Sequence, residues 1–384
     1  MLPLLRSRHL ADPSICFEGS DLKKIRVIVV DDSALVRSLL VGIINRQADM
    51  ECVGAANDPI VARQMIRELS PDVITLDIEM PRMDGIEFLG HLMRLRPMPV
   101  VMISTLTERG ADVTMKALEL GAVDFVSKPR LGVVDGLGEL AAQIVEKIRI
   151  AASAHIRRVG SESRVDMADA SSKNQEIRIP VALTGRVSTE KMVFIGASTG
   201  GTEAIKEILV KLPADFPAIV ITQHMPPGFT TSFAARLNGL CKIAVREAVN
   251  GERLLPGHAY IAPGGFQFRV DRSGANYVAV VEDGEAVNRH KPSVEVLFQS
   301  GAKIVGRNAF GIMLTGMGND GAKALKDMKD AGSYNFVQDE MSCVVFGMPR
   351  EAIARGAANE VLPLGEIASA LVARVCKTTD RFRV

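Results

Sequence analysis

Residues 191–213 read KMVFIGASTGGTEAIKEILVKLP, in which an apolar run, a glycine-bracketed serine and a helical pattern follow one another directly. The run MVFI has the composition of a buried strand, and the segment after Gly201 repeats apolar residues at helical spacing. The sequence therefore predicts a tight strand-to-helix turn around Ser198. A turn of this kind presents either a nucleophilic serine or a cradle of backbone N–H groups for a cofactor phosphate.

The residues around Ser198 fit a nucleophile better than a phosphate cradle. A dinucleotide fingerprint has the pattern G-x-G-x-x-G and an acidic residue about 20 positions later that binds the ribose. Ser198 occupies the place of the second glycine, the next predicted strand ends in Gln223 and His224, and no P-loop lysine follows. Gly196 and Gly200 instead complete the pattern Gly-x-Ser-x-Gly, in which small neighbours permit a strained turn that exposes the serine hydroxyl. The phosphate cradle remains the alternative.

Strand and helix patterns alternate along most of the chain, which predicts an α/β fold. Between residues 25 and 128, helical segments separate five β-branched runs: IRVIVVDD, ECVGAA, DVITLD, PVVMIS and DFVSK. The alternation resumes after Lys191, and the passage GHAYIAPGGFQFRVDRSGANYVAVVED has the Gly/Pro punctuation of antiparallel strands. Such spacing is typical of parallel sheets covered by helices on both faces. We expect two doubly wound parallel-sheet domains, the second with a small antiparallel portion.

Composition gives the boundaries of these domains. The 384 residues suit two to three domains of roughly 100–200 residues each. The segment between the two α/β patterns is polar and lacks Phe, Tyr and Trp, as a linker does. The predicted division is an N-terminal extension (1–22), a first domain (23–150), an interdomain linker (151–188), a second domain (189–376) and a C-terminal tail (377–384).

Composition also argues against several classes of partner. The net charge is +1, aromatic residues make up 4% and Trp is absent, so neither a basic surface nor a stacking platform for nucleic acid is expected. No apolar run approaches the roughly 20 residues of a membrane span, and the N-terminal apolar stretch is too short for a secretory signal. The five cysteines are scattered without a C-x-x-C pair, which is typical of reduced cytosolic thiols. We therefore expect a cytoplasmic protein.

Polar residues follow several predicted strands of the first domain, where an open parallel sheet binds its ligands. Asp31 and Asp32 end the first strand, Asp77 the third, Ser104 the fourth and Lys128 the fifth. Three converging carboxylates repel one another unless a hard cation lies among them, and oxygen ligands suit Mg²⁺. An aspartate supported in this way can act as a nucleophile and form an aspartyl phosphate. The alternative is that these aspartates cap helices, as Asp32 would at the start of the next one.

The first domain resembles the receiver domain of two-component response regulators. The motifs VVDDS, TLDIEMPRMDG, MIS and SKP fall in register over about 120 residues. The resemblance implies a flavodoxin-like fold with Asp77 as the phosphoacceptor. It further implies that Asp31, Asp32 and Asp77 surround the Mg²⁺ ion and that Ser104 and Lys128 contact the phosphoryl group.

A serine nucleophile needs a base and an acid that orients the base, and the second domain offers both. His224 follows the predicted strand after Ser198, and Asp320 lies in TGMGNDG after another strand, so all three residues fall at one edge of the predicted sheet. His258 and His290 are rival bases in the loop-rich passage. Asp320 has a second interpretation, as the N-cap of the helix AKALKDMKDAG.

The motifs FIGASTGG, ITQHMPPGFT, YIAPGG, RHKPSV and LTGMGNDG are similar to those of the effector domain of chemotaxis protein-glutamate methylesterases. The resemblance implies a Rossmann-like α/β esterase domain with Ser198 as nucleophile, His224 as general base and then acid, and Asp320 as the orienting carboxylate. It also implies an oxyanion hole that uses Thr199 and the backbone N–H of Met317.

Together the two resemblances, which span residues 23–376, imply a phosphorylation-activated enzyme of chemotaxis adaptation. It would hydrolyse glutamate methyl esters on methyl-accepting chemotaxis receptors and deamidate glutamine side chains. A chemotaxis histidine kinase would phosphorylate Asp77, with Mg²⁺ serving the receiver only and no cofactor serving the esterase. We expect the receiver to cover the catalytic face until it is phosphorylated.

Two functions of other classes compete with this interpretation. One is a response regulator whose second half binds DNA, but that half shows no helix-turn-helix pattern with a basic recognition helix. The other is a receptor adaptor that has lost turnover, against which the presence of Ser198, His224 and Asp320 argues.

Overall fold

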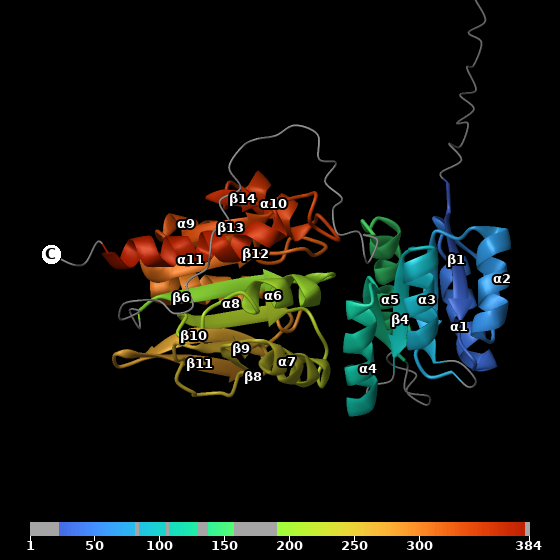
Figure 1. The fold of residues 1–384 in the computed structure, drawn as a ribbon, viewed down its shortest axis with the longest axis horizontal. Coiled ribbons are helices and arrows are strands. Elements are labelled where there is room, and N and C mark those ends of the chain that lie inside the picture. The colour runs from blue at the N-terminus through green and yellow to red at the C-terminus, as the bar shows by residue number, and fades with distance from the viewer. Residues whose placement is uncertain (1–22, 81–83, 105–106, 129–136, 157–189, 381–384) are drawn as a thin grey trace, which may run out of the picture.

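Two parallel sheets, each with helices on both faces, make up the described part of the chain (Figure 1). The computed structural model describes residues 23–80, 84–104, 107–128, 137–156 and 190–380. The predicted extension, most of the predicted linker and residues 381–384 of the predicted tail lie outside the described residues. The parts before and after the linker are called the N-terminal unit and the C-terminal unit below. The predicted fold class is confirmed.

The N-terminal unit has a five-stranded parallel sheet in the order β2-β1-β3-β4-β5. Its strands are β1 (Ile25–Val30), β2 (Met50–Ala56), β3 (Val73–Asp77), β4 (Val100–Ser104) and β5 (Asp124–Ser127). Helices α1 (Ala34–Asn45) and α5 (Leu137–Ala152) pack on one face, and α2 (Pro59–Leu69), α3 (Gly85–Leu95) and α4 (Glu108–Glu119) pack on the other. All five predicted strands are present, and the central strands β1, β3 and β4, which helices cover on both faces, are buried along most of their length.

The C-terminal unit has a seven-stranded parallel sheet in the order β14-β13-β12-β6-β7-β9-β8. Its strands are β6 (Met192–Ala197), β7 (Ala218–Gln223), β8 (Ala244–Glu247), β9 (His258–Ile261), β12 (Ala309–Met313), β13 (Tyr334–Gln338) and β14 (Glu360–Leu362). Helices α6 (Gly201–Leu209), α7 (Phe229–Leu240) and α11 (Leu364–Asp380) cover one face. The other face carries α8 (Val294–Ser300), α9 (Ala322–Asp330), α10 (Met348–Ala354) and the antiparallel hairpin of β10 (Gln267–Ser273) and β11 (Asn276–Glu282).

Only part of residues 257–283, the passage predicted to form antiparallel strands, does so. Strand β9 lies between β7 and β8 and runs parallel to both, and the antiparallel pairing is confined to β10 and β11. A parallel crossover normally contains a helix. Here the loop between β8 and β9 has none and pairs instead with β11, where Gly251 N–H donates to Ala279 O and Leu254 N–H donates to Tyr277 O. Helix α10 and strand β14 were not predicted, and α11 continues beyond Cys376.

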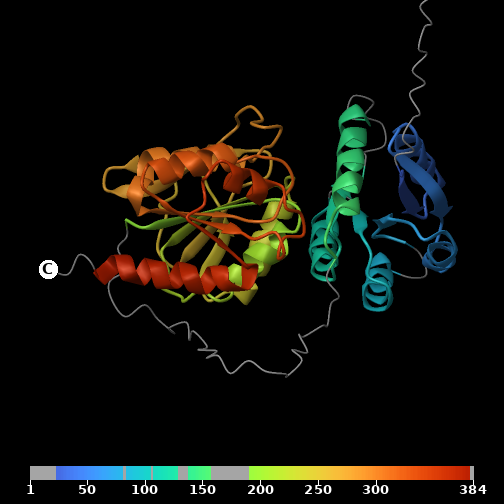
Figure 2. The ribbon, with the colours of Figure 1, turned by 90° about the horizontal axis from the view of Figure 1, so that it is seen from above.

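The two units contact each other through α4 and β5 of the first and α6 and α7 of the second (Figures 1 and 2). The rings of Phe125 and Phe229 stack across this interface, with centroids 4.4 Å apart. Beside them, Arg236 Nε donates to Glu119 Oε1 at 2.7 Å, and Lys206 Nζ lies 3.4 Å from the same oxygen. The interface thus combines an apolar centre with an ionic rim, as protein interfaces generally do.

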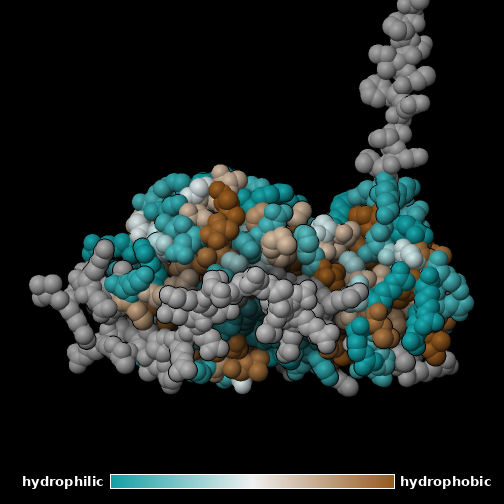
Figure 3. All heavy atoms as spheres, turned by 45° about the horizontal axis from the view of Figure 1, so that its top comes forward, coloured by the Kyte–Doolittle hydropathy of each residue, from teal (hydrophilic) through white to brown (hydrophobic). Residues whose placement is uncertain are grey.

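The surface seen in Figure 3 is mostly polar over the described residues that are visible. Figure 3 shows hydrophilic side chains over most of one face of both units, with apolar side chains gathered in smaller areas between them. No helix in the described ranges has both the length and the apolar character that a membrane span requires.

Candidate active site and phosphoacceptor site

Ser198, His224 and Asp320 lie at the carboxyl edge of the second sheet. They follow β6, β7 and β12, and β6 pairs in parallel with β7 on one side and with β12 on the other. The chain moves from β6 to β7 and later returns to the opposite side of β6, so the three residues surround a topological switch point. Open α/β sheets bind their ligands at such a point. The order of the strands therefore brings together residues that are 122 positions apart in the chain (from 198 to 320).

The turn that carries Ser198 has space only for glycine at key positions. Gly200 has φ +76°, a left-handed conformation that disfavours residues with a Cβ. A Cβ on Gly201 would lie 2.1 Å from Gln223 Oε1, and one on Gly196 would lie 2.3 Å from a methyl group of Val294. The backbone N–H of Ser198 donates to Thr315 O at 3.0 Å, which fixes the turn to β12. The glycines therefore allow the serine turn to pack tightly at the edge of the sheet.

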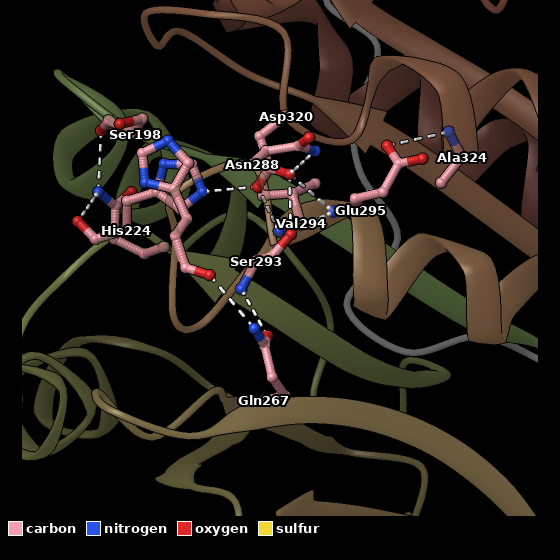
Figure 4. A network of polar contacts seen from close by, with 11 residues as sticks. Ser198, His224, Gln267, Asn288, Ser293, Val294, Glu295, Asp320 and Ala324 are labelled. Atoms are coloured by element: carbon pink, nitrogen blue, oxygen red, sulfur yellow. Dashed lines mark hydrogen bonds and ion pairs between the residues drawn. The ribbon is translucent and has the colours of Figure 1, made fainter. Parts of the chain in front are cut away.

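His224 forms the link between this turn and Asp320. Its Nε2 lies 2.8 Å from Asp320 Oδ2, whereas its buried Nδ1 has no hydrogen-bond partner in the described part of the chain. Figure 4 shows Ser198 and Asp320 on opposite sides of the imidazole. The nitrogen that remains available to accept a proton from a serine is therefore Nδ1.

The Asp320 carboxylate is buried and receives hydrogen bonds from several segments (Figure 4). Besides His224, it accepts from Asn288 Nδ2 at 2.7 Å, from Ser293 Oγ at 2.8 Å and from the backbone N–H of Val294 at 2.7 Å. Burial alone would raise the pKa of Asp320, but the hydrogen bond and charge of His224, together with Asn288 and Ser293, lower it to about 2. The group is therefore ionised near neutral pH.

The interpretation of Asp320 as a cap of the following helix is wrong. Helix α9 has Gly321 at its N-cap position, and no side chain caps it. Asp320 instead accepts the first backbone N–H of α8, a helix that ends 20 positions before it in the sequence. Ser293, the N-cap of α8, donates its hydroxyl to the same carboxylate.

Thr199 and Met317, the two residues predicted to form an oxyanion hole, lie beside Ser198 but differ in the contacts of their side chains. The backbone N–H groups of Thr199 and Met317 make no hydrogen bond within the ranges that the structure describes. The hydroxyl of Thr199 is engaged, because it donates to the carboxylate of Asp124 in the N-terminal unit. Met317 is 44% exposed. The two N–H groups are thus available to an oxyanion, and their role remains a prediction.

The two histidines that compete with His224 for the role of the base, His258 and His290, lie in different parts of the C-terminal unit. His258 lies at the amino end of β9, away from the serine turn, and its Nδ1 is 3.0 Å from Pro256 O. His290 stacks on His224 with ring centroids 3.7 Å apart and an interplanar angle of 11°. Burial, followed by the charge of His224, lowers the pKa of His290 to about 3, so its ring is neutral near pH 7. His290 stacks on the ring of His224, and its side chain makes no hydrogen bond with a carboxylate in the part of the chain that the structure describes.

Gln223 is a residue of this site that the sequence did not reveal. Its amide Nε2 donates to Ser198 O at 2.8 Å and to His224 O at 3.3 Å, so one side chain joins the ends of β6 and β7. It stands directly before His224 in the motif ITQHMPPGFT, but a glutamine at a strand end has no distinct signal of its own.

A cavity of about 340 Å³ separates the two units in front of Ser198. The C-terminal unit contributes Ser198, His224 and Met317 to its walls, and the N-terminal unit contributes Asp124 and Lys147. Ser198 itself is only 8% exposed. Residues of both units therefore surround the space in front of Ser198.

The carboxylates predicted for the first sheet lie together at its carboxyl edge. Oxygen atoms of Asp31, Asp32 and Asp77 all lie within 4.8 Å of one another. Lys128 Nζ lies 2.7 Å from Asp77 Oδ2 and 3.4 Å from Asp31 Oδ2. Burial raises the pKa of Asp77 to about 6, against the opposing effect of Lys128. Three carboxylates with a single neighbouring lysine are a donor set that fits Mg²⁺.

The helix-cap interpretation of Asp32 is also wrong. Ser33 caps α1, because its hydroxyl accepts the N–H of Val36, and the side chain of Asp32 is exposed beside the other two carboxylates. Ser104, expected to contact a phosphoryl group, is buried at the end of β4, and its Oγ accepts from Thr114 Oγ1 at 2.7 Å. Its hydroxyl therefore lies against α4 in this conformation.

Comparison with known proteins agrees with both units. Residues 27–132 match the family of response regulator receiver domains, and residues 193–371 match the CheB methylesterase family. The chain is 76% identical over 372 residues to protein-glutamate methylesterase/protein-glutamine glutaminase 1 of Albidiferax ferrireducens, covering 96% of this chain and 99% of that protein. It is 57% identical over 362 residues to protein-glutamate methylesterase/protein-glutamine glutaminase 3 of Burkholderia lata, covering 94% and 99%.

A solved structure, the catalytic domain of Thermotoga maritima CheB methylesterase, is 38% identical and covers 48% of this chain and 98% of its own, with a TM-score of 0.47. By its two matched domains, the protein is a response regulator that carries a hydrolase domain. More particularly, the chain belongs to the family of protein-glutamate methylesterases/protein-glutamine glutaminases.

The burial of Asp77 predicts that its charge destabilises the folded receiver. The folded pKa of about 6 lies above the ordinary value of 3.8, so the stability contributed by Asp77 is fully present below pH 3.8 and is lost as the pH rises through 6. Asp77→Asn should therefore increase the free energy of unfolding at pH 7.5 by about 1–3 kcal/mol and have little effect near pH 4.

Urea unfolding followed by circular dichroism at the two pH values measures this difference. Asp112→Asn, which removes an exposed charge from α4, is the matched control and should change neither value. If the Asp77→Asn variant is no more stable than the wild type at pH 7.5, the charge of Asp77 does not destabilise the folded receiver.

Proposed function

We propose that this protein is a phosphorylation-activated protein-glutamate methylesterase that demethylates chemoreceptors during chemotaxis adaptation and also deamidates glutamine side chains. The observation that carries the proposal is the alignment of Ser198, His224 and Asp320 at three neighbouring strand ends, with a 2.8 Å contact between the last two. Both activities appear in the names of relatives that match almost the whole chain. They share one reaction type, because an ester and a primary amide of glutamate differ only in the group that leaves.

Acylation begins when Ser198 Oγ attacks the side-chain carbonyl carbon. His224 accepts the hydroxyl proton at Nδ1, and the ionised Asp320 stabilises the resulting imidazolium through Nε2. The backbone N–H groups of Thr199 and Met317 would stabilise the negative charge that develops on the carbonyl oxygen. When the tetrahedral intermediate collapses, methanol or ammonia leaves with the proton from His224, and a serine ester of the substrate remains.

Deacylation repeats these steps with water. His224 Nδ1 removes a proton from the water, whose oxygen attacks the acyl carbon, and the proton passes to Ser198 Oγ as it leaves. The products are a glutamate carboxylate and the original serine. His290 keeps the ring of His224 in position by stacking, and Gln223 keeps the two strand ends together.

In our proposal the receiver inhibits this chemistry by covering it. Asp124 accepts the hydroxyl of Thr199, the residue next to the nucleophile, and the stacked rings of Phe125 and Phe229 lie in the same interface. The cavity in front of Ser198 is bounded partly by the receiver. A protein substrate therefore reaches the serine only after the receiver has moved.

Phosphorylation of Asp77 would supply the signal for that movement. Asp31, Asp32 and Asp77 would hold Mg²⁺, which offsets their charge and that of an incoming phosphoryl group. Lys128, which contacts Asp77, would also contact the phosphoryl group, and Ser104, at the end of the adjacent strand, would do so once its hydroxyl leaves Thr114. We propose a chemotaxis histidine kinase as the phosphoryl donor and the cytoplasm as the location.

Ser198→Ala should abolish ester hydrolysis without affecting the fold, because it removes one hydroxyl from a turn that its glycines maintain. Loss of the nucleophile in a serine hydrolase lowers kcat by roughly 10⁴–10⁶. The measurement is methanol release from a methylated glutamyl peptide, with Ser369→Ala on α11 as the control. Retention of more than about a tenth of wild-type kcat would assign the nucleophile to another residue, since the expected loss is far larger.

Asp124→Ala should increase resting esterase activity, because it removes the receiver's contact with Thr199. Loss of roughly 0.7–1.4 kcal/mol of docking free energy increases the open population about three- to tenfold. The esterase activity of the same variant should rise by a smaller factor than that of the wild type when acetyl phosphate and Mg²⁺ are added. Its control is Asp49→Ala, which removes an aspartate that pairs with Arg149 inside the receiver. Resting activity that is equal to or below the wild-type value would contradict inhibition by this contact.

A further inference from the structure

The turn at residues 287–290 has a backbone conformation that its sequence disfavours. Val287 and His290 exchange two hydrogen bonds, with N···O distances of 3.1 and 2.9 Å. The two residues between them, Asn288 and Arg289, have φ values of +52° and +68°. Two-residue hairpin turns with positive φ at both central positions favour Asn followed by Gly. Asn288 fits this preference, but an arginine at the second position is strained, and such strain is found most often at functional sites.

Both neighbours of Arg289 are fixed to the catalytic residues. Asn288 donates its amide to Asp320 at 2.7 Å, and the ring of His290 stacks on that of His224. In addition, His290 O accepts from the amide of Gln267 at 3.2 Å. The backbone of Arg289 therefore has a defined position relative to the site of reaction. A side chain that binds a substrate specifically needs a backbone fixed in this way.

The side chain of Arg289 is exposed and makes no hydrogen bond or ion pair with any described residue. It borders the cavity that opens on Ser198. The two lysines that border the same cavity, one from each unit, are each paired with an aspartate, since Lys291 pairs with Asp283 and Lys147 pairs with Asp124. Among the described residues that border this cavity, Arg289 is thus the cation of the methylesterase domain that is available to a ligand.

We propose that Arg289 forms a carboxylate-binding subsite that selects glutamyl esters and amides flanked by acidic side chains. This inference rests on the proposed function and adds the substrate class. A glutamate methyl ester carries no charge, so electrostatic selection acts through its neighbours in the substrate. A guanidinium group binds a carboxylate through two parallel N–H donors, and a fixed backbone makes that contact specific.

The test uses the full-length protein, activated with acetyl phosphate and Mg²⁺, and two peptides that carry the same glutamate methyl ester. One peptide has glutamates on either side of the ester, and the other has glutamines. We expect the wild type to hydrolyse the acidic peptide with a kcat/KM about five- to tenfold higher at low ionic strength, mainly through KM, and this ratio to fall as salt is added. Arg289→Gln should bring the ratio close to one. Arg355→Gln, which removes an exposed charge at the end of α10, should preserve it.

A second variant separates recognition from folding. Arg289→Gly relieves the positive φ, so it should raise the midpoint of thermal unfolding by about 1–3 °C while losing the preference for the acidic peptide. A variant that is both more stable and less selective cannot owe its loss of selectivity to misfolding.

Three outcomes would overturn the inference. Equal hydrolysis of both peptides by the wild type would overturn the subsite and leave the proposed function intact. Hydrolysis of neither peptide would overturn both. An unchanged ratio in Arg289→Gln, together with altered activity before phosphorylation, would assign Arg289 to docking of the receiver instead.

Discussion

The Asp320 carboxylate is the group on which the arrangement of the active site depends. It connects the end of β12 with His224 after β7, with the turn that contains Asn288, and with the N-terminus of α8. Each contact stabilises the negative charge, and the low pKa of about 2 is the result. In the proposed mechanism, a carboxylate held in its ionised form orients the imidazole of His224 and stabilises its positive charge without taking up the proton itself.

The proposed active site and the proposed phosphoacceptor site are joined by β5, a strand of four residues. Its first residue, Asp124, accepts the hydroxyl of Thr199, and the residue directly after the strand, Lys128, lies 2.7 Å from Asp77. Phe125, between them, stacks on Phe229 of the methylesterase domain. Because β5 is so short, a change in the position of Lys128 can shift Asp124 and Phe125, which contact the methylesterase domain. In this account, phosphorylation changes the population of docked receiver and leaves the catalytic residues as they are.

Local sequence patterns predicted the strands and the residues at their ends, because burial on both faces and the carboxyl-edge rule act over short stretches. Ser198, His224 and Asp320 were placed together in this way, as were Asp31, Asp32 and Asp77. Contacts between distant segments had no such signal. The partners of Asp320 at residues 288 to 294, the double hydrogen bond of Gln223 and the contact of Thr199 with Asp124 depend on tertiary packing. Strand β9 was misassigned for the same reason, since its crossover is made by pairing with β11 and not by a helix.

The reactivity of Ser198 shows whether the docked receiver denies access to that serine. A fluorophosphonate probe modifies an activated serine hydroxyl, and mass spectrometry of the digested full-length protein gives the rate of modification at Ser198. We expect slow modification in the resting protein and a severalfold faster rate after acetyl phosphate and Mg²⁺ are added. A rate at Ser198 that is already high at rest, or that falls on phosphorylation, would contradict inhibition by the docked receiver.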